Sequence, residues 1–170
     1  HGARVSMMIG LLATVITVLV GVLIGIVSGF VGGMTDSSLM RVTDFFLVLP
    51  TFVLAIILAP IILDIIGVDA EVAGLRATLV VIVIVIGITS WASTSRIIRS
   101  QTLSVKERAF IDRARVIGAS GWHTMRVHIL PNVTNLRILQ GPIQFSLGIL
   151  AEAGGAFVGL GAQPPTPSWG

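Results

Sequence analysis

The 170-residue sequence contains no cysteine and few charged residues. Without cysteine there is no disulfide framework, no thiolate metal site and no cysteine nucleophile. Only 11% of the residues are charged and 54% are hydrophobic, whereas an ordinary soluble domain has about 25% charged residues. A water-soluble protein of this size could not bury that much apolar surface in one core. We therefore expect most of the chain to face lipid.

Several chemical signatures are also missing. The sequence has no Gly-x-x-x-x-Gly-Lys-Ser/Thr phosphate loop, so it predicts no ATP hydrolysis by this chain. Its three histidines are not clustered with carboxylates, which argues against a metal site. Its serines lack a His and Asp arrangement, which argues against a hydrolase. No signal peptide is visible after His1, and we interpret the chain as a fragment truncated at one or both ends.

Four apolar segments predict membrane-spanning helices. They lie at about 5–31, 45–66, 77–91 and 138–160. The first has 27 residues without charge, which as a helix would be roughly 40 Å long and could cross a bilayer with tilt. We expect an all-α polytopic helix bundle forming one domain over residues 1–170. Gly32–Asp44 is predicted to be a short polar connection.

Glycines recur at four-residue spacing in the first and fourth segments, which places each row on one face of a helix. Lipid gives helices no hydrophobic reason to associate, so small residues that allow close approach are typical of helix contacts. We interpret six glycines as packing residues: Gly21, Gly25, Gly29, Gly33, Gly155 and Gly159.

Two residues inside the apolar segments are further candidates. Pro50 fits either a hinge in the second segment or a helix start, and both interpretations stay open. Glu152 is the only charge in the fourth segment. An intramembrane carboxylate is a functional candidate by default. It would line a solute path or hydrogen-bond between helices, and we favour the structural role.

The basic residues are concentrated in one stretch. Seven of the eleven Lys and Arg lie between Arg96 and Arg126, opposed only by Glu107 and Asp112, so this stretch has a net charge of +5. Beside apolar spans such a cluster indicates a cytoplasmic loop, here about 93–137. A nucleic-acid surface is the weaker interpretation because aromatic residues are sparse. The resulting orientation predicts about six spans in the intact protein.

The first part of this loop has helix signals. Ser104–Glu107 has the spacing of a capping box, which predicts a helix from about Val105 to Ile117. Phe110, Ala114 and Ile117 would form its narrow apolar stripe.

A second helix is predicted to follow at a sharp corner. Gly118 stands where a left-handed glycine would end the first helix. Ser120 can cap the next helix, over about 121–130, and Pro131 is expected to stop it. From the residues alone, this helix pair is a solvated loop, a segment lying on headgroups or a docking element for a cytoplasmic partner.

The loop resembles the EAA signature of ABC importer permeases. That signature reads Glu-Ala-Ala, three residues, Gly, nine residues, Ile, one residue, Leu-Pro. Here Asp112-Arg-Ala-Arg-Val-Ile-Gly118 is followed after nine residues by His128-Ile-Leu-Pro131. The spacing matches, Asp112 replaces Glu, and Arg113 departs from Ala.

Other segments resemble the C-type permease subunit of dipeptide, oligopeptide and nickel importers. They are Gly2–Ser6, Phe30–Gly33, Leu150–Ala153, Phe157–Gly161 and the Pro-rich tail Gln163–Gly170. The resemblance covers essentially the whole chain. It implies the type I importer permease fold with six spans, one before His1 and one after Gly170.

The resemblance also implies a site and partners. The loop would be a coupling helix that rests on a separate ATPase, through Phe110, Asp112, Arg113, Ala114, Arg115, Ile117, Gly118, Ala119, Leu130 and Pro131. The implied partners are a homologous B-type permease, two ATPase subunits that hold ATP and Mg, an extracytoplasmic solute-binding protein and the lipid of a bacterial inner membrane. No cofactor on this chain and no nucleic acid are implied.

The implied function is inward transport of peptides or similar small solutes, with dipeptides, longer peptides, glutathione and nickel complexes all open. A stand-alone channel or secondary carrier is the alternative, and it would not need a docking loop. An intramembrane enzyme would need a catalytic pair within the spans, and the sequence offers none.

Overall fold

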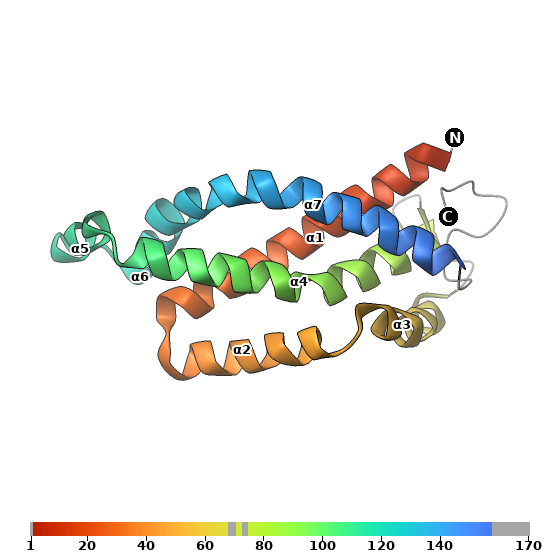
Figure 1. Ribbon diagram of the computed structural model, residues 1–170, viewed down its shortest axis with the longest axis horizontal. Helices are drawn as coiled ribbons and strands as arrows, with labels where there is room; N and C mark the ends of the chain where they lie inside the picture. The colour runs from red at the N-terminus through yellow and green to blue at the C-terminus, as the bar shows by residue number, and fades with distance from the viewer. Residues whose placement is uncertain (1, 68–70, 73–74, 158–170) are drawn as a thin grey trace. The chain divides into compact units, whose positions relative to one another are not determined.

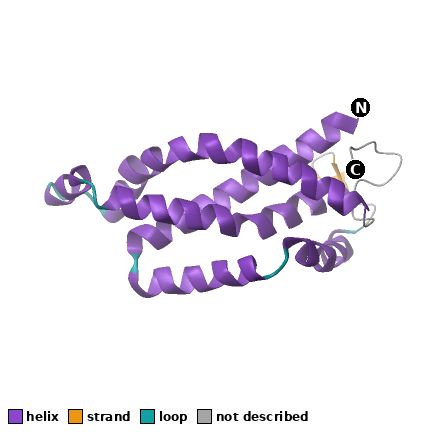
Figure 2. Ribbon diagram, viewed as in Figure 1, coloured by secondary structure: helices purple, strands orange, loops and turns teal. Residues whose placement is uncertain are grey.

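The computed structural model describes residues 2–67, 71–72 and 75–157. Apart from short turns, the described chain is helical except for a short antiparallel hairpin of β1 (Glu71–Val72) and β2 (Leu75–Arg76), so the all-α class is confirmed (Figures 1 and 2). The other elements are α1 (Gly2–Val31), α2 (Gly33–Val48), α3 (Thr51–Ile66), α4 (Ala77–Lys106), α5 (Ala109–Val116), α6 (Gly121–His123), the π-helix η1 (Thr124–Ile129) and α7 (Leu130–Phe157).

Two helices in the described part are long and apolar enough to cross a membrane, Ser6–Val31 in α1 and all of α4. The pair α2 and α3 meets the same criteria only when the two helices are taken together as one broken span. Helix α7 covers the described part of the fourth predicted span. It is not among the candidate spans, because polar residues such as Gln140, Gln144 and Glu152 lower its mean hydropathy. Length and composition therefore support two or three of the four predicted spans.

The region between the first and third predicted spans differs from the prediction. Residues 33–48 form helix α2 and not a polar connection. Gly32 and Gly33 have φ of +72° and +59°, a left-handed conformation that lets the chain turn sharply out of α1. The predicted span 45–66 is split, and Pro50 is the N-cap of α3, with φ −58°. Because proline fixes φ and lacks an N–H donor, it suits a helix start.

Helix α4 is much longer than the predicted span 77–91, since it continues to Lys106. The polar residues Thr94, Ser95 and Thr102 look like a loop in the sequence but are buried. Thr102 satisfies its hydroxyl within the helix, donating to the Ile98 carbonyl at 2.8 Å. The loop predicted over 93–137 therefore begins as a membrane-type helix.

The chain divides into two compact units, each with its own core. The first unit comprises residues 1–17, 48–90 and 142–170, and the second comprises 18–47 and 91–141. In the first unit, the start of α1 packs on α4 through Ile9, Ala13, Leu79, Ile82, Val83 and Ile86. A further cluster joins Ala59 of α3 to Val81 and Val85 of α4. In the second unit, buried residues of α1, α4, α5, η1 and the start of α7 form one core: Val22, Ile26, Ile98, Val105, Ile111, Ile129 and Val133.

A row of glycines lets α1 approach α4 closely within the second unit. A Cβ on Gly21 would lie 2.7 Å from the Thr94 Cβ, and one on Gly25 would lie 2.7 Å from the Ser95 carbonyl oxygen. On Gly29 the nearest atom would be 2.8 Å away. Real Cβ atoms do not sustain such distances, so these three positions depend on glycine.

The remaining predicted packing glycines behave differently. An added Cβ on Gly33 would have no described atom within 4 Å, and Gly33 forms the turn, so its assignment to the packing face is wrong. Gly155 lies half-buried in α7, and Gly159 lies outside the described residues.

Candidate functional site

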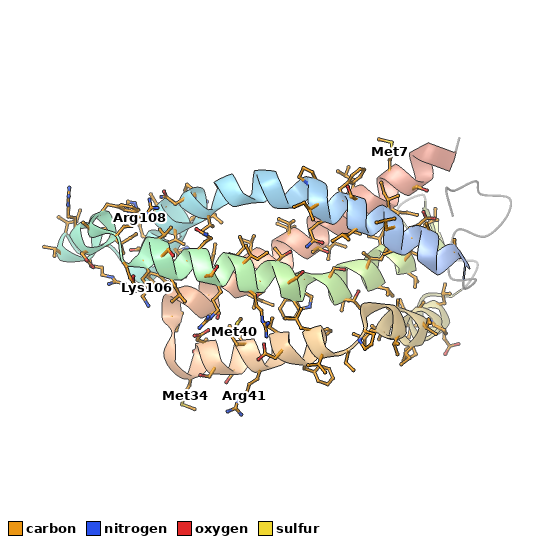
Figure 3. All side chains as sticks on the ribbon, viewed as in Figure 1. Met7, Met34, Met40, Arg41, Lys106 and Arg108 are labelled. Atoms are coloured by element: carbon orange, nitrogen blue, oxygen red, sulfur yellow. The ribbon has the colours of Figure 1, made fainter. Side chains whose placement is uncertain are left out.

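The first helix of the basic stretch starts later than the capping box predicted, because α4 continues to Lys106. Ser104 lies inside α4 and donates its hydroxyl to the Ser100 carbonyl at 3.2 Å, so the predicted capping box is wrong. Helix α5 starts at Ala109, with Arg108 as an extended N-cap that makes no side-chain cap bond. Lys106 and Arg108 lie at this corner between α4 and α5 (Figure 3).

The end of α5 has a complete Schellman arrangement. The Ala119 N–H donates to the Ala114 carbonyl at 2.9 Å, and the Gly118 N–H donates to the Arg115 carbonyl at 3.0 Å. Gly118 has φ +88°, so the left-handed glycine predicted for this position is confirmed. The backbone there is both hydrogen-bonded and sharply turned.

The next helix starts as predicted but does not stop. Ser120 accepts a hydrogen bond from the His123 N–H at 3.2 Å, which confirms the cap. Helix α6 then runs through η1 into α7, so the prediction that Pro131 ends the helix is wrong. In a regular α-helix the proline ring clashes with the carbonyl four residues earlier. The wider π turn before Pro131, in which the Leu130 N–H reaches the Met125 carbonyl, relieves that clash.

The inner face of α5 is anchored in the second unit. Ile111 is 0% exposed and Ala114 is 4% exposed, and both Ile111 and Ile129 belong to its core. Phe110 packs on the same core. The predicted stripe placed Ile117 inward, but Ile111 takes the inward position and Ile117 is 84% exposed. The helix ends at Val116 and Ile117 is its C-cap, so Ile117 lies beyond the helical stripe.

The outer face of α5 presents aliphatic side chains beside arginines. Val116 is 88% exposed and directly precedes Ile117. Arg113 and Arg115 are exposed as well, and Arg115 lies 3.5 Å from Asp112. We name Arg113, Arg115, Val116, Ile117 and Gly118 the α5 corner. Exposed apolar side chains rimmed by polar ones are typical of interaction sites.

The predicted coupling-loop residues thus separate into two groups. Four face the core or are partly buried: Phe110, Ala114, Ala119 and Leu130. Six are exposed: Asp112, Arg113, Arg115, Ile117, Gly118 and Pro131. Sequence analysis missed Val116, although its position next to Ile117 and Gly118 was the available signal.

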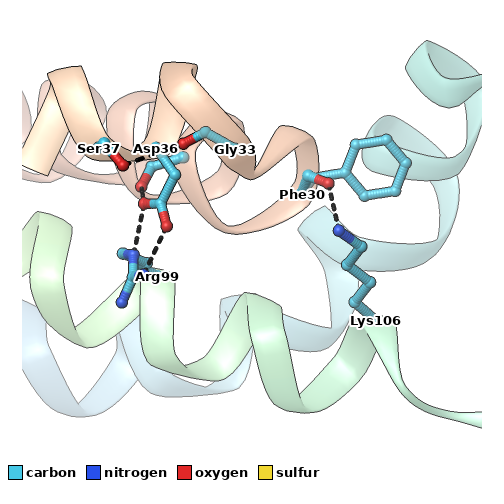
Figure 4. Close-up of polar contacts among 7 residues, drawn as sticks. Phe30, Gly33, Asp36, Ser37, Arg99 and Lys106 are labelled. Carbon is cyan, nitrogen blue, oxygen red and sulfur yellow. Dashed lines mark hydrogen bonds and ion pairs between the residues drawn. The ribbon is translucent and has the colours of Figure 1, made fainter.

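A partly buried polar cluster lies at the start of α2 (Figure 4). The Arg99 Nε and Nη2 atoms donate to the two carboxylate oxygens of Asp36 at 2.6 Å each. The Ser28 hydroxyl donates to the same carboxylate. The cluster joins α1, α2 and α4, and sequence analysis missed it because its members are far apart in the chain.

Lys106 makes a second connection between α1 and α4. Its Nζ donates to the Phe30 carbonyl at 2.6 Å and lies 5.7 Å from the Phe30 ring centroid (Figure 4). Phe30 is in the last turn of α1, where carbonyls have no partner within the helix. The last residue of α4 therefore caps the end of α1.

Glu152 lies in the first unit. It is buried, and its Oε2 accepts a hydrogen bond from the Ser6 hydroxyl at 3.0 Å. Its Oε1 has no hydrogen-bond partner among the described residues. The hydrogen bond connects α1 to α7 within the first unit. The described residues contain no group of His, Cys, Asp or Glu suited to hold a metal ion.

Comparisons with known proteins identify the family of this chain. A family model described as "Binding-protein-dependent transport system inner membrane component" matches residues 21–170. The oligopeptide transport system permease protein OppC of Mycobacterium bovis is 34% identical over 170 residues, covering 100% of this chain and 55% of that protein. The di/tripeptide transport system permease protein DppC of Pseudomonas aeruginosa is 36% identical over 170 residues, covering 100% of this chain and 52% of that protein.

The chain thus spans about half the length of the curated relatives that it matches. The family model covers most of the chain, including α2 to α7 and the α5 corner. This chain belongs to the family of binding-protein-dependent transport system inner membrane components.

Proposed function

We propose that this chain is part of the permease subunit of an ATP-driven importer, which moves peptides or similar small solutes inward. A separate ATPase subunit powers alternating access in this proposal. Membership of the family, the permease names of its relatives and the apolar helices α1 and α4 support it. The site for ATP and Mg lies on the ATPase, and this chain contributes the membrane path and the contact.

The observation that carries the proposal is the α5 corner. Val116 and Ile117 are almost fully exposed, whereas Ile111, five residues before Val116, is fully buried. A partner with an apolar groove would cover the two aliphatic side chains, and the flanking arginines would meet acidic residues at its rim. Ala114 lies on the inner face of α5, so the contact is made by the exposed pair rather than by Ala114.

The packing of α5 against α1 and α4 explains how a partner bound at the α5 corner would move the membrane-spanning helices. The inner face of α5 shares one core with α1 and α4, and the Schellman bonds hold the turn at Gly118. The Asp36–Arg99 pair and the Lys106–Phe30 bond join α1, α2 and α4. A displacement of the corner would therefore be passed to these helices instead of being absorbed in a loose loop.

The proposed assembly includes a homologous B-type permease, two ATPase subunits and an extracytoplasmic solute-binding protein in a bacterial inner membrane. The basic stretch between α4 and α7 lies on the cytoplasmic side in this arrangement, in line with the positive-inside tendency. The solute is a peptide or a similar small molecule that the binding protein selects.

Reconstitution of the full-length permease with its partner subunits tests this proposal. We expect solute uptake to require both ATP and the ATPase. We expect Ile117→Ser to reduce uptake and solute-stimulated ATP hydrolysis about five- to thirtyfold, since an exposed apolar anchor at an interface contributes roughly 1–2 kcal/mol. The control is Met34→Ser, which removes an exposed apolar side chain on α2 and should change neither rate. Uptake without the ATPase would contradict the proposal and favour a stand-alone carrier.

A further inference from the structure

A groove between α1 and the segment from α6 to α7 is not used by the proposed coupling mechanism. It has a volume of about 200 Å³ and lies within the second unit. Its lining is mostly apolar, from Leu23 and Val27 of α1 and from Met125 and Leu130 of the opposite wall, with Trp122 and Arg126 completing it.

The apolar wall of this groove belongs to a membrane-spanning segment. Leu23 and Val27 are one helical turn apart in the candidate span Ser6–Val31. Leu23 is 63% exposed, as expected for a side chain that faces acyl chains. An extended hydrocarbon chain could lie along this wall without burying any polar side chain.

The opposite wall supplies an amphipathic ring and a cation. Trp122 is 67% exposed and stands four residues before Arg126 on the same continuous helical segment. Arg126 is exposed and forms no ion pair with any described carboxylate. Among the described residues that line the groove, none is acidic. Tryptophan is enriched at membrane interfaces, and a guanidinium binds phosphate oxygens with charge-assisted hydrogen bonds.

We propose that this groove binds an anionic phospholipid. One acyl chain lies along Leu23 and Val27, the Trp122 ring lies at the interface, and Arg126 contacts the phosphate and headgroup. The positive charge of the groove favours an anionic over a neutral lipid. Arg126 has no acidic neighbour in the described lining, and it lies in a stretch whose net charge is +5. The lipid site is independent of ATPase docking, since the α5 corner and the groove share no residue.

Fluorescence quenching by brominated lipids tests this site in the assembled full-length complex. Lipid nanodiscs would contain brominated phosphatidylglycerol or brominated phosphatidylcholine at equal mole fraction. The contribution of Trp122 is the difference between the native complex and Trp122→Phe, which cancels all other tryptophans. We expect about a fivefold preference of the Trp122 site for phosphatidylglycerol over phosphatidylcholine, as one basic residue near the membrane surface provides.

A charge-removing variant and a matched control make the test specific. Arg126→Gln should abolish the headgroup preference while both brominated lipids still quench Trp122. Arg41→Gln removes one exposed positive charge elsewhere in the second unit and should retain the preference. Equal quenching by both lipids in the native complex, or a preference that survives Arg126→Gln, would overturn the proposal. Absence of any Trp122 quenching would also overturn it, because protein and not lipid would then cover the groove.

Discussion

Arg99 on α4 holds Asp36 on α2 with two parallel contacts of 2.6 Å, although 63 residues separate them in the sequence. Ser28 on α1 donates to the same carboxylate. The two ionic side chains are about one-third exposed or less. Three helices of the second unit therefore meet at one charge-assisted cluster, and α2 cannot swing away from α4 without breaking both contacts.

Replacing the carboxylate should weaken this cluster. Asp36→Asn leaves the guanidinium of Arg99 without its anionic partner, and we expect the free energy of unfolding to fall by about 1–3 kcal/mol. Thermal unfolding of the full-length permease in detergent measures the change. The control is Arg96→Gln, which breaks the exposed ion pair with Asp44 and should have little effect. An equal loss in both variants would contradict a special role for the Asp36–Arg99 pair.

Replacing glycine by alanine should affect stability differently in the glycine row of α1 and at an open position in α7. Gly25→Ala would force a Cβ to 2.7 Å from the Ser95 carbonyl oxygen, so we expect overpacking to destabilise the protein by about 1–3 kcal/mol. An added Cβ on Gly141 in α7 would have no described atom within 4 Å. Gly141→Ala creates no such contact, and we expect it to destabilise the protein by less than Gly25→Ala, its remaining cost being the helical conformation that alanine would adopt directly before Pro142. Chemical denaturation of the two variants provides the comparison, and the account fails if Gly25→Ala is tolerated as well as Gly141→Ala.

The turn at Gly118 should require glycine for local order. With φ at +88°, Gly118→Ala is strained by about 1–2 kcal/mol. Asparagine tolerates the left-handed region better, so Gly118→Asn should be milder. Amide hydrogen exchange reports the effect directly. The Ala119 amide, bonded to the Ala114 carbonyl, should exchange faster in Gly118→Ala, whereas amides of α1 should not change. Unchanged exchange at Ala119 would show that the Schellman bonds do not depend on this residue.

Two substitutions of Glu152 distinguish a structural role of this residue from a role in the solute path. Glu152→Gln keeps an acceptor for the Ser6 hydroxyl, so we expect stability and uptake close to those of the native protein. Glu152→Leu removes the acceptor and should lower stability by about 1–3 kcal/mol. Paired measurements of thermal stability and uptake test this prediction. Loss of uptake in Glu152→Gln with unchanged stability would favour the path instead.

Sequence analysis predicted best where one segment determines its own structure. The apolar run of α1, the left-handed Gly118 and the Ser120 cap are local features, and each is present. The predictions failed where contacts with a distant segment determine the local structure. The polar end of α4 looked like a loop because the partners of Thr94 and Ser95 are glycines of α1, more than sixty residues earlier. Helix α2 looked like a connection for the same reason.

The errors in the loop have a different physical origin. Ser104 has the sequence of a cap, but its hydroxyl donates back to Ser100 and α4 continues past it. Pro131 has the sequence of a stop, but the π turn in η1 accommodates its ring. Ile117 left the predicted inner stripe for a third reason: α5 ends at Val116, so Ile117 is the C-cap of the helix and is exposed.

The most direct test of the account is cysteine cross-linking at this corner. The 170 residues contain no cysteine, so Ile117→Cys adds one reactive thiol to this part of the full-length permease, opposite a cysteine in the groove of the co-expressed ATPase. We predict a cross-link in native membranes whose yield changes with nucleotide, and none from the buried position in Ala114→Cys. The contrary result is no cross-link, with Ile117→Cys labelled only by membrane-impermeant reagents added outside. That result would place the α5 corner on the wrong side of the membrane for an ATPase.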